Sequence, residues 1–351
     1  MSDLLAIAGA LVTVLVIGLL LSPLAAPFDS LSWWAGWVRQ RPEEPEAAPA
    51  RAAAPGPAAP GAPAPATPAG PFVVFLSGVG TMGRQIDAWE QRLTDRLAAG
   101  MRGPAGGGVM VTGLFLFSAS AQPLAERRRT GAFWSRLGRM REESPGRLSL
   151  LADQFINWRN LTQVLVSMDS CYGPIYDAGG ARSLYAALLN HGYAPGGGAP
   201  VVLIGYSGGA QVCLGAATYL KPALRAPLTV ISLGGAVGSD RGLEAVDRMV
   251  HIYGSDDLEQ KLPAVLLPSR WPLARRSHWN RALADGRLRC VVLPGMAHTG
   301  PGGYLDPDRA GPDRRSFLEV TATEMLEVIR SSAAARPAAS GRRPPAPSGA
   351  R

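Results

Sequence analysis

A serine lies in the middle of a glycine-rich turn that follows an apolar segment. Residues 200–204 predict a buried strand, and the small residues after the turn predict the start of a closely packed helix. Glycine has no Cβ, so it permits a strand-to-helix turn tight enough to expose a serine hydroxyl. Such a hydroxyl becomes a nucleophile when a base lies beside it. The residues of this turn are Gly205, Tyr206, Ser207, Gly208 and Gly209.

Two later segments place an acid and a histidine directly after apolar segments. The predicted strand at 249–253 is followed by Gly-Ser-Asp-Asp, which ends in Asp256 and Asp257, and the predicted strand at 291–293 is followed by a loop that contains His298. A serine nucleophile needs a base, and the base needs a group that fixes its tautomer. His298 and Asp257 are the candidates for these roles, and Asp256 is the alternative acid.

The order of these residues resembles the α/β-hydrolase superfamily, in which serine, acid and histidine follow one another at successive strand ends. The resemblance extends over about residues 71–330, and some twenty positions carry it. It implies an α/β fold with a mostly parallel sheet flanked by helices. It also implies that Ser207, Asp257 and His298 form a catalytic triad of a serine esterase or lipase-like enzyme.

The resemblance also implies an oxyanion hole made by two backbone amides. One belongs to Gly208, the residue after the nucleophile, and the other to the loop after the first core strand. That loop reads Ser-Gly-Val-Gly, and the amide of Val79 is favoured over that of Gly80. Ser77 stands where the superfamily commonly has histidine, which leaves the support of this loop open.

These roles lead us to expect hydrolysis of a carboxylic ester through an acyl-enzyme, without a cofactor or metal. A lipid or acyl ester is preferred because of the apolar N-terminus. A thioesterase or an acyltransferase would use the same groups, and a catalytically inactive hydrolase fold that serves as a binding module is a further alternative. The three cysteines show no metal-ligand spacing and form no disulfide framework.

A nicotinamide-dependent oxidoreductase is a weaker alternative. Residues 78–83 read Gly-Val-Gly-Thr-Met-Gly, which fits the dinucleotide fingerprint in form. The fingerprint also needs an acidic residue about 20 positions on, at the end of the next strand, to bind the ribose. Ser118 and Ala119 follow that strand, and the motif Tyr-x-x-x-Lys of short-chain dehydrogenases does not occur.

The elements that must position the candidate residues alternate between strands and helices, which is typical of a parallel sheet. We expect six strands, most of them buried on both faces, and helices at 84–98, 181–191, 208–220 and 314–330. The long segment at 118–180 predicts a helical insertion or cap. The expected strands are Phe72–Leu76, Val109–Phe117, Pro200–Ile204, Leu228–Leu233, Arg248–Tyr253 and Leu288–Leu293.

The N-terminal 41 residues predict a single transmembrane anchor with its juxtamembrane segment. Residues 4–27 carry no charge, and Asp3 stands where a signal peptide would have basic residues. Tryptophans at 33, 34 and 37 and two following arginines predict an interface and place the catalytic domain in the cytoplasm. Residues 42–70 predict a Pro/Ala-rich linker, and residues 331–351 predict a disordered basic tail.

The composition agrees with one sizeable hydrolase domain between these ends. The 351 residues are 47% hydrophobic and 18% charged, with a net charge of +8, which excludes a wholly disordered chain. The charge predicts an anionic partner, and no nucleic-acid-binding module is recognised. Two arginine-rich aromatic stretches at 127–141 and 270–281 predict docking on an anionic lipid surface, and a merely solvated face is the alternative.

Overall fold

The computed structural model describes residues 70–79, 86–102, 107–114, 116 and 147–334. In this part of the chain, strands and helices alternate as the sequence predicts. The strands are β1 (Phe72–Leu76), β2 (Val109–Leu114), β3 (Val201–Tyr206), β4 (Leu228–Leu233), β5 (Arg248–Gly254) and β6 (Leu288–Leu293). The helices are α2 (Ala88–Met101), α5 (Arg147–Met168), α6 (Gly173–Asn190), α7 (Gly209–Leu224), α8 (Gly242–Ala245), α9 (Lys261–Leu266), the 3-10 turn η1 (Pro268–Arg270), α10 (His278–Ala284) and α11 (Phe317–Ala334).

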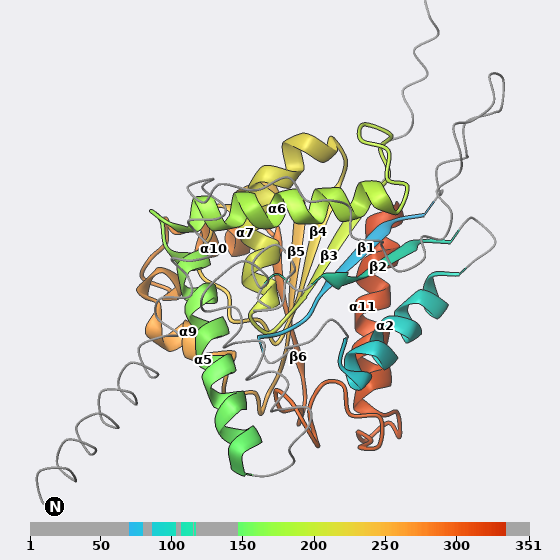
Figure 1. Ribbon diagram of the computed structural model, residues 1–351, viewed down its shortest axis with the longest axis vertical. Coiled ribbons are helices and arrows are strands. Elements are labelled where there is room, and N and C mark those ends of the chain that lie inside the picture. The colour runs from blue at the N-terminus through green and yellow to red at the C-terminus, as the bar shows by residue number, and fades with distance from the viewer. Residues whose placement is uncertain (1–69, 80–85, 103–106, 115, 117–146, 335–351) are drawn as a thin grey trace, which may run out of the picture.

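The strands form one six-stranded parallel sheet in the order β2-β1-β3-β4-β5-β6. The predicted α/β class with a parallel sheet and flanking helices is confirmed. Figure 1 shows α2 and α11 together on one side of the sheet, with α6 and α7 on the other. Each crossover therefore carries the chain back to start the next strand in the same direction.

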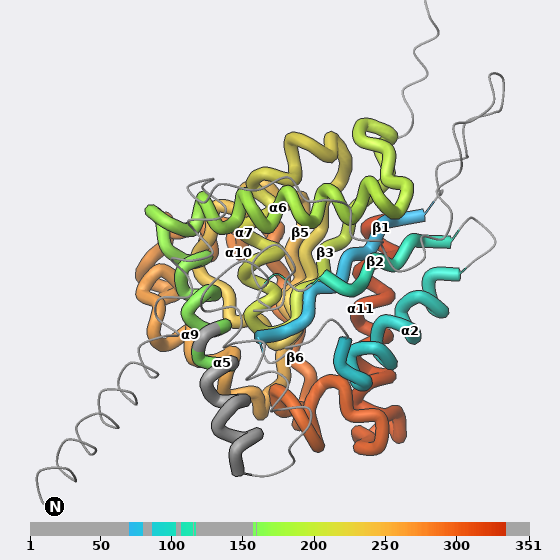
Figure 2. The backbone as a smooth tube through the Cα atoms, in the orientation of Figure 1, coloured from blue at the N-terminus to red at the C-terminus, as the bar shows by residue number. Residues whose placement is uncertain are grey.

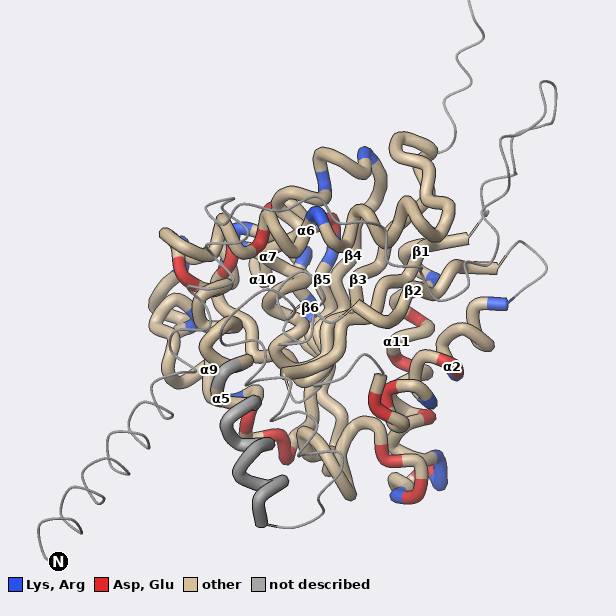
Figure 3. Tube along the Cα trace, in the orientation of Figure 1, with Lys and Arg blue, Asp and Glu red and all other residues tan. Residues whose placement is uncertain are grey.

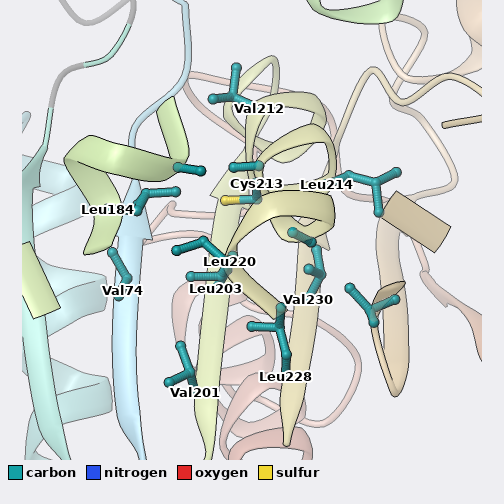
Figure 4. Close-up of a cluster of buried hydrophobic side chains, with 14 of the residues drawn as sticks. Val74, Leu184, Val201, Leu203, Val212, Cys213, Leu214, Leu220, Leu228 and Val230 are labelled. Carbon is teal, nitrogen blue, oxygen red and sulfur yellow. The ribbon is translucent and has the colours of Figure 1, made fainter. Parts of the chain in front are cut away.

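The sheet separates two hydrophobic cores because successive side chains of a strand point to opposite faces. On β1, Val74 packs into the core beneath α6 and α7, whereas Phe75 packs into the core beneath α2 and α11. The β3 residues Leu203 and Ile204 divide in the same way. Figure 4 shows the first core, where side chains of α7 lie against those of β3 and β4. Two-sided burial explains why these strands read as continuous apolar segments.

The parallel arrangement brings the candidate residues to one edge of the sheet. Ser77 follows β1, Ser207 follows β3, Asp257 follows β5 and His298 follows β6. Because all six strands run in the same direction, their carboxyl ends lie at the same edge, where ligands bind in open α/β sheets. The tube in Figure 2 shows β1 in blue beside β2 and β3, which places the loop after β1 next to the turn that bears Ser207.

Several predicted boundaries are wrong. Strand β2 ends at Leu114 rather than Phe117, and α6 begins at Gly173 rather than at 181. Strand β6 has the predicted bounds but is an edge strand, with Val292 about half exposed, so it is not buried on both faces. Helix α11 continues to Ala334 and takes in the first residues that we assigned to the tail.

The predicted insertion at 118–180 contains α5 and the first part of α6. Helix α6 packs along α7 and reaches β1 and β2, so it is a crossover helix of the sheet rather than part of a cap. Residues 117–146, which include the first arginine-rich stretch, lie outside the described residues.

The predicted anchor at 1–41 and the predicted linker at 42–70, apart from Gly70, also lie outside the described residues, as does the tail beyond 334. No helix within the described ranges has both the length and the apolar character needed to cross a bilayer. Figure 3 shows basic and acidic residues interspersed along the described chain. In the second arginine-rich stretch, Arg270 stacks 3.7 Å above the ring of Trp279, and Trp279 is buried.

Candidate active site

Ser207 sits on a strained turn between β3 and α7. Its φ angle is +50°, in the left-handed region that few residues other than glycine adopt. The flanking glycines are required by space: a Cβ on Gly205 would lie 2.3 Å from the Cα of Ala210, and one on Gly209 would lie 2.7 Å from the carbonyl oxygen of Ser77. The glycine pattern read from the sequence therefore corresponds to a real steric need, and the turn directs the Ser207 hydroxyl toward the carboxyl edge of the sheet.

The three predicted side chains form one hydrogen-bonded chain. His298 Nε2 lies 2.9 Å from Ser207 Oγ, and His298 Nδ1 lies 2.7 Å from Asp257 Oδ2. All three residues are buried, with Ser207 8% and His298 7% exposed. Because Asp257 can only accept when ionised, the imidazole carries its proton on Nδ1 and presents Nε2 as an acceptor to the serine hydroxyl.

Asp257 is kept ionised by three donors. Burial alone would raise the pKa of Asp257, but hydrogen bonds from His298, from the Tyr304 hydroxyl and from the backbone amide of Gln260 hold it below its ordinary value. Tyr304 in turn accepts a 2.8 Å hydrogen bond from the amide of Gly254. Sequence reasoning missed Tyr304, because no motif marks a tyrosine six residues after the histidine.

The alternative acid, Asp256, points away from the histidine. Its side chain is exposed and accepts a 2.8 Å hydrogen bond from Ser255 Oγ. The structure thus places Asp257, and not its neighbour, against His298.

A second buried histidine supports the turn that holds Asp257. His251 is fully buried between Ser232, 2.9 Å from Nδ1, and the side-chain oxygen of Gln260, 3.3 Å from Nε2. Burial lowers the pKa of His251 to about 3, so the ring stays neutral. Gln260 therefore joins this pair to Asp257 through its own backbone amide, which fixes the position of the carboxylate.

The loop after β1 covers the nucleophile. We call the described residues Ser77, Gly78 and Val79 the oxyanion loop, after the role that the sequence predicts for this segment. A Cβ on Gly208 would lie 2.5 Å from Val79 Cγ1, and one on Gly78 would lie 3.1 Å from Ser207 Cβ. The two residues whose amides were predicted to form the oxyanion hole are thus adjacent in space, and Gly208 also stands at the N-terminus of α7, where the helix dipole favours negative charge. Gly80 lies outside the described residues.

Three side chains around this loop and the histidine were not predicted from the sequence. Glu90 of α2 is 3% exposed and accepts hydrogen bonds from the oxyanion loop, and Asn160 of α5 donates a 2.5 Å hydrogen bond to the carbonyl oxygen of Val79. Glu259 lies on the solvent side, with its Oε2 3.4 Å from His298 Nε2. None belongs to a local motif, because the contacts join separate elements.

Within the described ranges, no three His, Cys, Asp or Glu residues are grouped so that they could hold a metal ion. Gly78, the first glycine of the dinucleotide-like motif, packs against Ser207, and residues 80–83 of that motif lie outside the described residues. No family model matches the chain, and no curated protein matches it. What the site can do therefore follows from its geometry: a buried serine, oriented toward an imidazole and a carboxylate, beside two backbone amides.

Proposed function

We propose that the chain is a serine hydrolase that cleaves a carboxylic ester through an acyl-enzyme intermediate. The observation that carries the proposal is the hydrogen-bonded chain from Ser207 through His298 to Asp257, with distances of 2.9 and 2.7 Å. The residues come from three separate strand ends and lie within hydrogen-bond reach of one another, which is the geometric requirement for nucleophilic catalysis.

In the first half of the reaction, Ser207 Oγ attacks the ester carbonyl carbon while His298 Nε2 takes its proton. The carboxylate of Asp257 stabilises the resulting imidazolium and keeps the ring in position. The carbonyl oxygen becomes an oxyanion, which the amides of Gly208 and Val79 would stabilise. His298 then gives the proton to the departing alkoxide.

In the second half, water attacks the acyl-enzyme carbonyl with His298 again as the base, which releases the acid and restores Ser207. A thioester would react with the same groups, and an alcohol in place of water would make the reaction an acyl transfer.

An apolar ester is the substrate class that the surroundings favour. The segment that follows Asp257 exposes large apolar side chains next to the site: Leu258 is 72% exposed, and Leu262, Val265 and Leu266 of α9 are all more than half exposed. An acyl chain bound there would remove this area from water. The apolar N-terminal segment leads us to propose in addition a membrane-anchored enzyme with its catalytic domain in the cytoplasm.

The test is active-site labelling of the full chain in detergent. A fluorophosphonate is expected to label the parent protein, and Ser207→Ala is expected to remove the label while the melting temperature stays within a few degrees. A series of p-nitrophenyl esters of increasing acyl length would then define the substrate class. Labelling that persists in the alanine variant would place the nucleophile at another residue, and a folded parent protein that does not label would favour a binding module; either result would overturn the proposal.

A further inference from the structure

The buried carboxyl group of Glu90 is hydrogen-bonded to the oxyanion loop. Glu90 Oε2 accepts a 2.6 Å hydrogen bond from Ser77 Oγ, and its Oε1 accepts a 3.4 Å hydrogen bond from the backbone amide of Gly78. Glu90 lies in the first turn of α2, a helix whose N-cap is Asp87. A buried acid is rare unless it is paired or neutral, so its presence beside this loop calls for a reason.

The contacts constrain the peptide that carries the Val79 amide from both sides. The peptide before it has its N–H on Glu90 and its carbonyl oxygen toward Gly209. The peptide after it has its carbonyl oxygen on the side chain of Asn160. Since peptides are planar, these contacts on both neighbours fix the positions of the Gly78 and Val79 Cα atoms, between which the middle peptide lies. Its N–H is the donor that the proposed oxyanion hole requires.

We propose that Glu90 is the positioning residue of the oxyanion loop, and that the loop stabilises an oxyanion well only while Glu90 is protonated. This inference rests on the proposed function. In its neutral form Glu90 still accepts from the Gly78 amide and can donate to Ser77 Oγ, so the loop keeps its support. In its ionised form the same bonds remain, but a negative charge then lies one peptide away from the amide that would stabilise a second negative charge.

The environment of Glu90 sets its ionisation in the range where the enzyme would work. Burial, with a smaller contribution from the carboxylate of Asp87, raises the pKa of Glu90 to about 7 against the opposing hydrogen bonds from Ser77 and Gly78. The charge of Glu90 also acts on Tyr206, the titratable side chain of the nucleophile turn. Burial holds the pKa of this phenol well above its ordinary value, so the phenol stays neutral. In the described residues, Asp87 is therefore the neighbouring charge that opposes ionisation of Glu90.

Replacement of Glu90 by glutamine separates the hydrogen bonding of this side chain from its ionisation. In Glu90→Gln, the new amide side chain would accept from the Gly78 amide through its oxygen and donate to Ser77 Oγ through its nitrogen, but it would not ionise. Replacement by alanine removes both bonds. Asp95→Asn is the matched control, because Asp95 is an exposed acid of the same helix whose carboxylate accepts a hydrogen bond from Gln91.

The experiment measures the rate of fluorophosphonate labelling of Ser207 from pH 5.5 to 9 in the full-length chain. Relative to Glu90→Gln, the parent and Asp95→Asn are expected to lose rate as the pH rises through about 7, and this comparison cancels the dependence on the protonation of His298 that all three proteins share. Glu90→Ala is expected to label about 10-fold more slowly than Glu90→Gln at every pH, and with an ester substrate to lower kcat with little change in KM, because an oxyanion contact acts only in the transition state.

The outcomes distinguish this inference from the proposed function. A parent protein that labels at Ser207, combined with a Glu90→Gln variant that keeps the alkaline decline, would overturn the inference and leave the serine hydrolase intact. So would a folded Glu90→Ala variant that labels as fast as Glu90→Gln. A parent protein that does not label at all would overturn both.

Discussion

The phenol of Tyr206 donates a 2.7 Å hydrogen bond to the backbone carbonyl oxygen of His298. Its ring also stacks on the imidazole, with ring centroids 5.7 Å apart and an angle of 22° between the planes. The residue that precedes the nucleophile thus holds the loop that carries the base. The side chain of Tyr206 therefore links the turn that carries Ser207 to the loop that carries His298.

Replacement of Tyr206 by phenylalanine is expected to slow the reaction without abolishing it. The ring would still stack, but the carbonyl oxygen of His298 would lose its buried donor, which costs about 1–3 kcal/mol. We expect a melting temperature lowered by several degrees and kcat lowered about 10-fold, because the imidazole would sample positions outside reach of Ser207. Thermal melts and ester kinetics of the purified variant measure both effects. Unchanged kcat with a lowered melting temperature would show that Tyr206 serves stability alone.

Replacement of Asp257 by asparagine tests which of the two adjacent acids orients the base. An amide cannot hold the imidazole proton on Nδ1 as a carboxylate does, so kcat is expected to fall by about 10³- to 10⁴-fold. Asp256→Asn is the control: this side chain is exposed and lies on Ser255, so kcat is expected to change less than twofold. Equal losses in the two variants would contradict the assignment of Asp257.

Two strands that are buried on both faces have the bounds that the sequence predicts. Leu228–Leu233 and Phe72–Leu76 match their predicted bounds, because an apolar segment between two glycine- or proline-rich turns has few other ways to bury itself. The predicted start of α6 was wrong. Gly179 and Gly180 stand directly before the predicted start, but the helix passes through them, and Gly180 faces Val212 of α7.

The nucleophile turn, the acid and the base were found because each directly follows a strand, where sequence and position in the sheet are linked. The side chains that support them were not found from the sequence. The hydrogen bonds of Glu90, Tyr304 and Asn160 join residues that are 13, 47 and 81 positions apart in the chain. A glutamate in an amphipathic helix looks the same in sequence whether it faces water or a buried loop. Only the packing of α2 against the sheet shows that Glu90 faces inward.

A buried carboxyl group away from the site predicts how stability depends on pH. Asp177 of α6 is 5% exposed, and its Oδ1 accepts a 2.7 Å hydrogen bond from Ser167 Oγ. Burial, together with the carboxylate of Asp240, raises the pKa of Asp177 to about 8. The folded state therefore keeps a proton that the unfolded chain loses near pH 4, so this group makes the fold less stable as the pH rises from about 4 to 8.

Asp177→Asn removes that dependence, because an amide keeps an acceptor for Ser167 and does not ionise. Relative to the parent, the variant is expected to gain stability as the pH rises from 5 to 8, by up to about 1.4 kcal/mol per pH unit. Melting temperatures of both proteins at pH 5, 6, 7 and 8 measure the difference, with Asp95→Asn as the exposed control. A difference that stays constant across this range would contradict the assigned ionisation.

The position of Glu259 predicts that the site prefers neutral substrates over anionic ones. Its carboxylate lies 3.4 Å from His298 Nε2 on the solvent side, and its side chain is 65% exposed. A negative charge at this point repels an anionic substrate more than a neutral one, by about 1 kcal/mol at contact distance in a well-solvated position. The imidazole at the centre of the site thus has one buried carboxylate behind it and one exposed carboxylate in front.

Glu259→Gln is therefore expected to raise kcat/KM about 5-fold for an ester with a free carboxylate, such as a succinate monoester, and less than twofold for a neutral ester of similar size. The gain is expected to shrink in 0.5 M salt, because exposed charges are screened. Asp256→Asn removes a neighbouring exposed charge that does not face the imidazole, and it is expected to leave the ratio of the two substrates unchanged. An equal gain for both esters would instead mean that Glu259 acts by holding a proton on His298 Nε2, since that effect does not depend on the charge of the substrate.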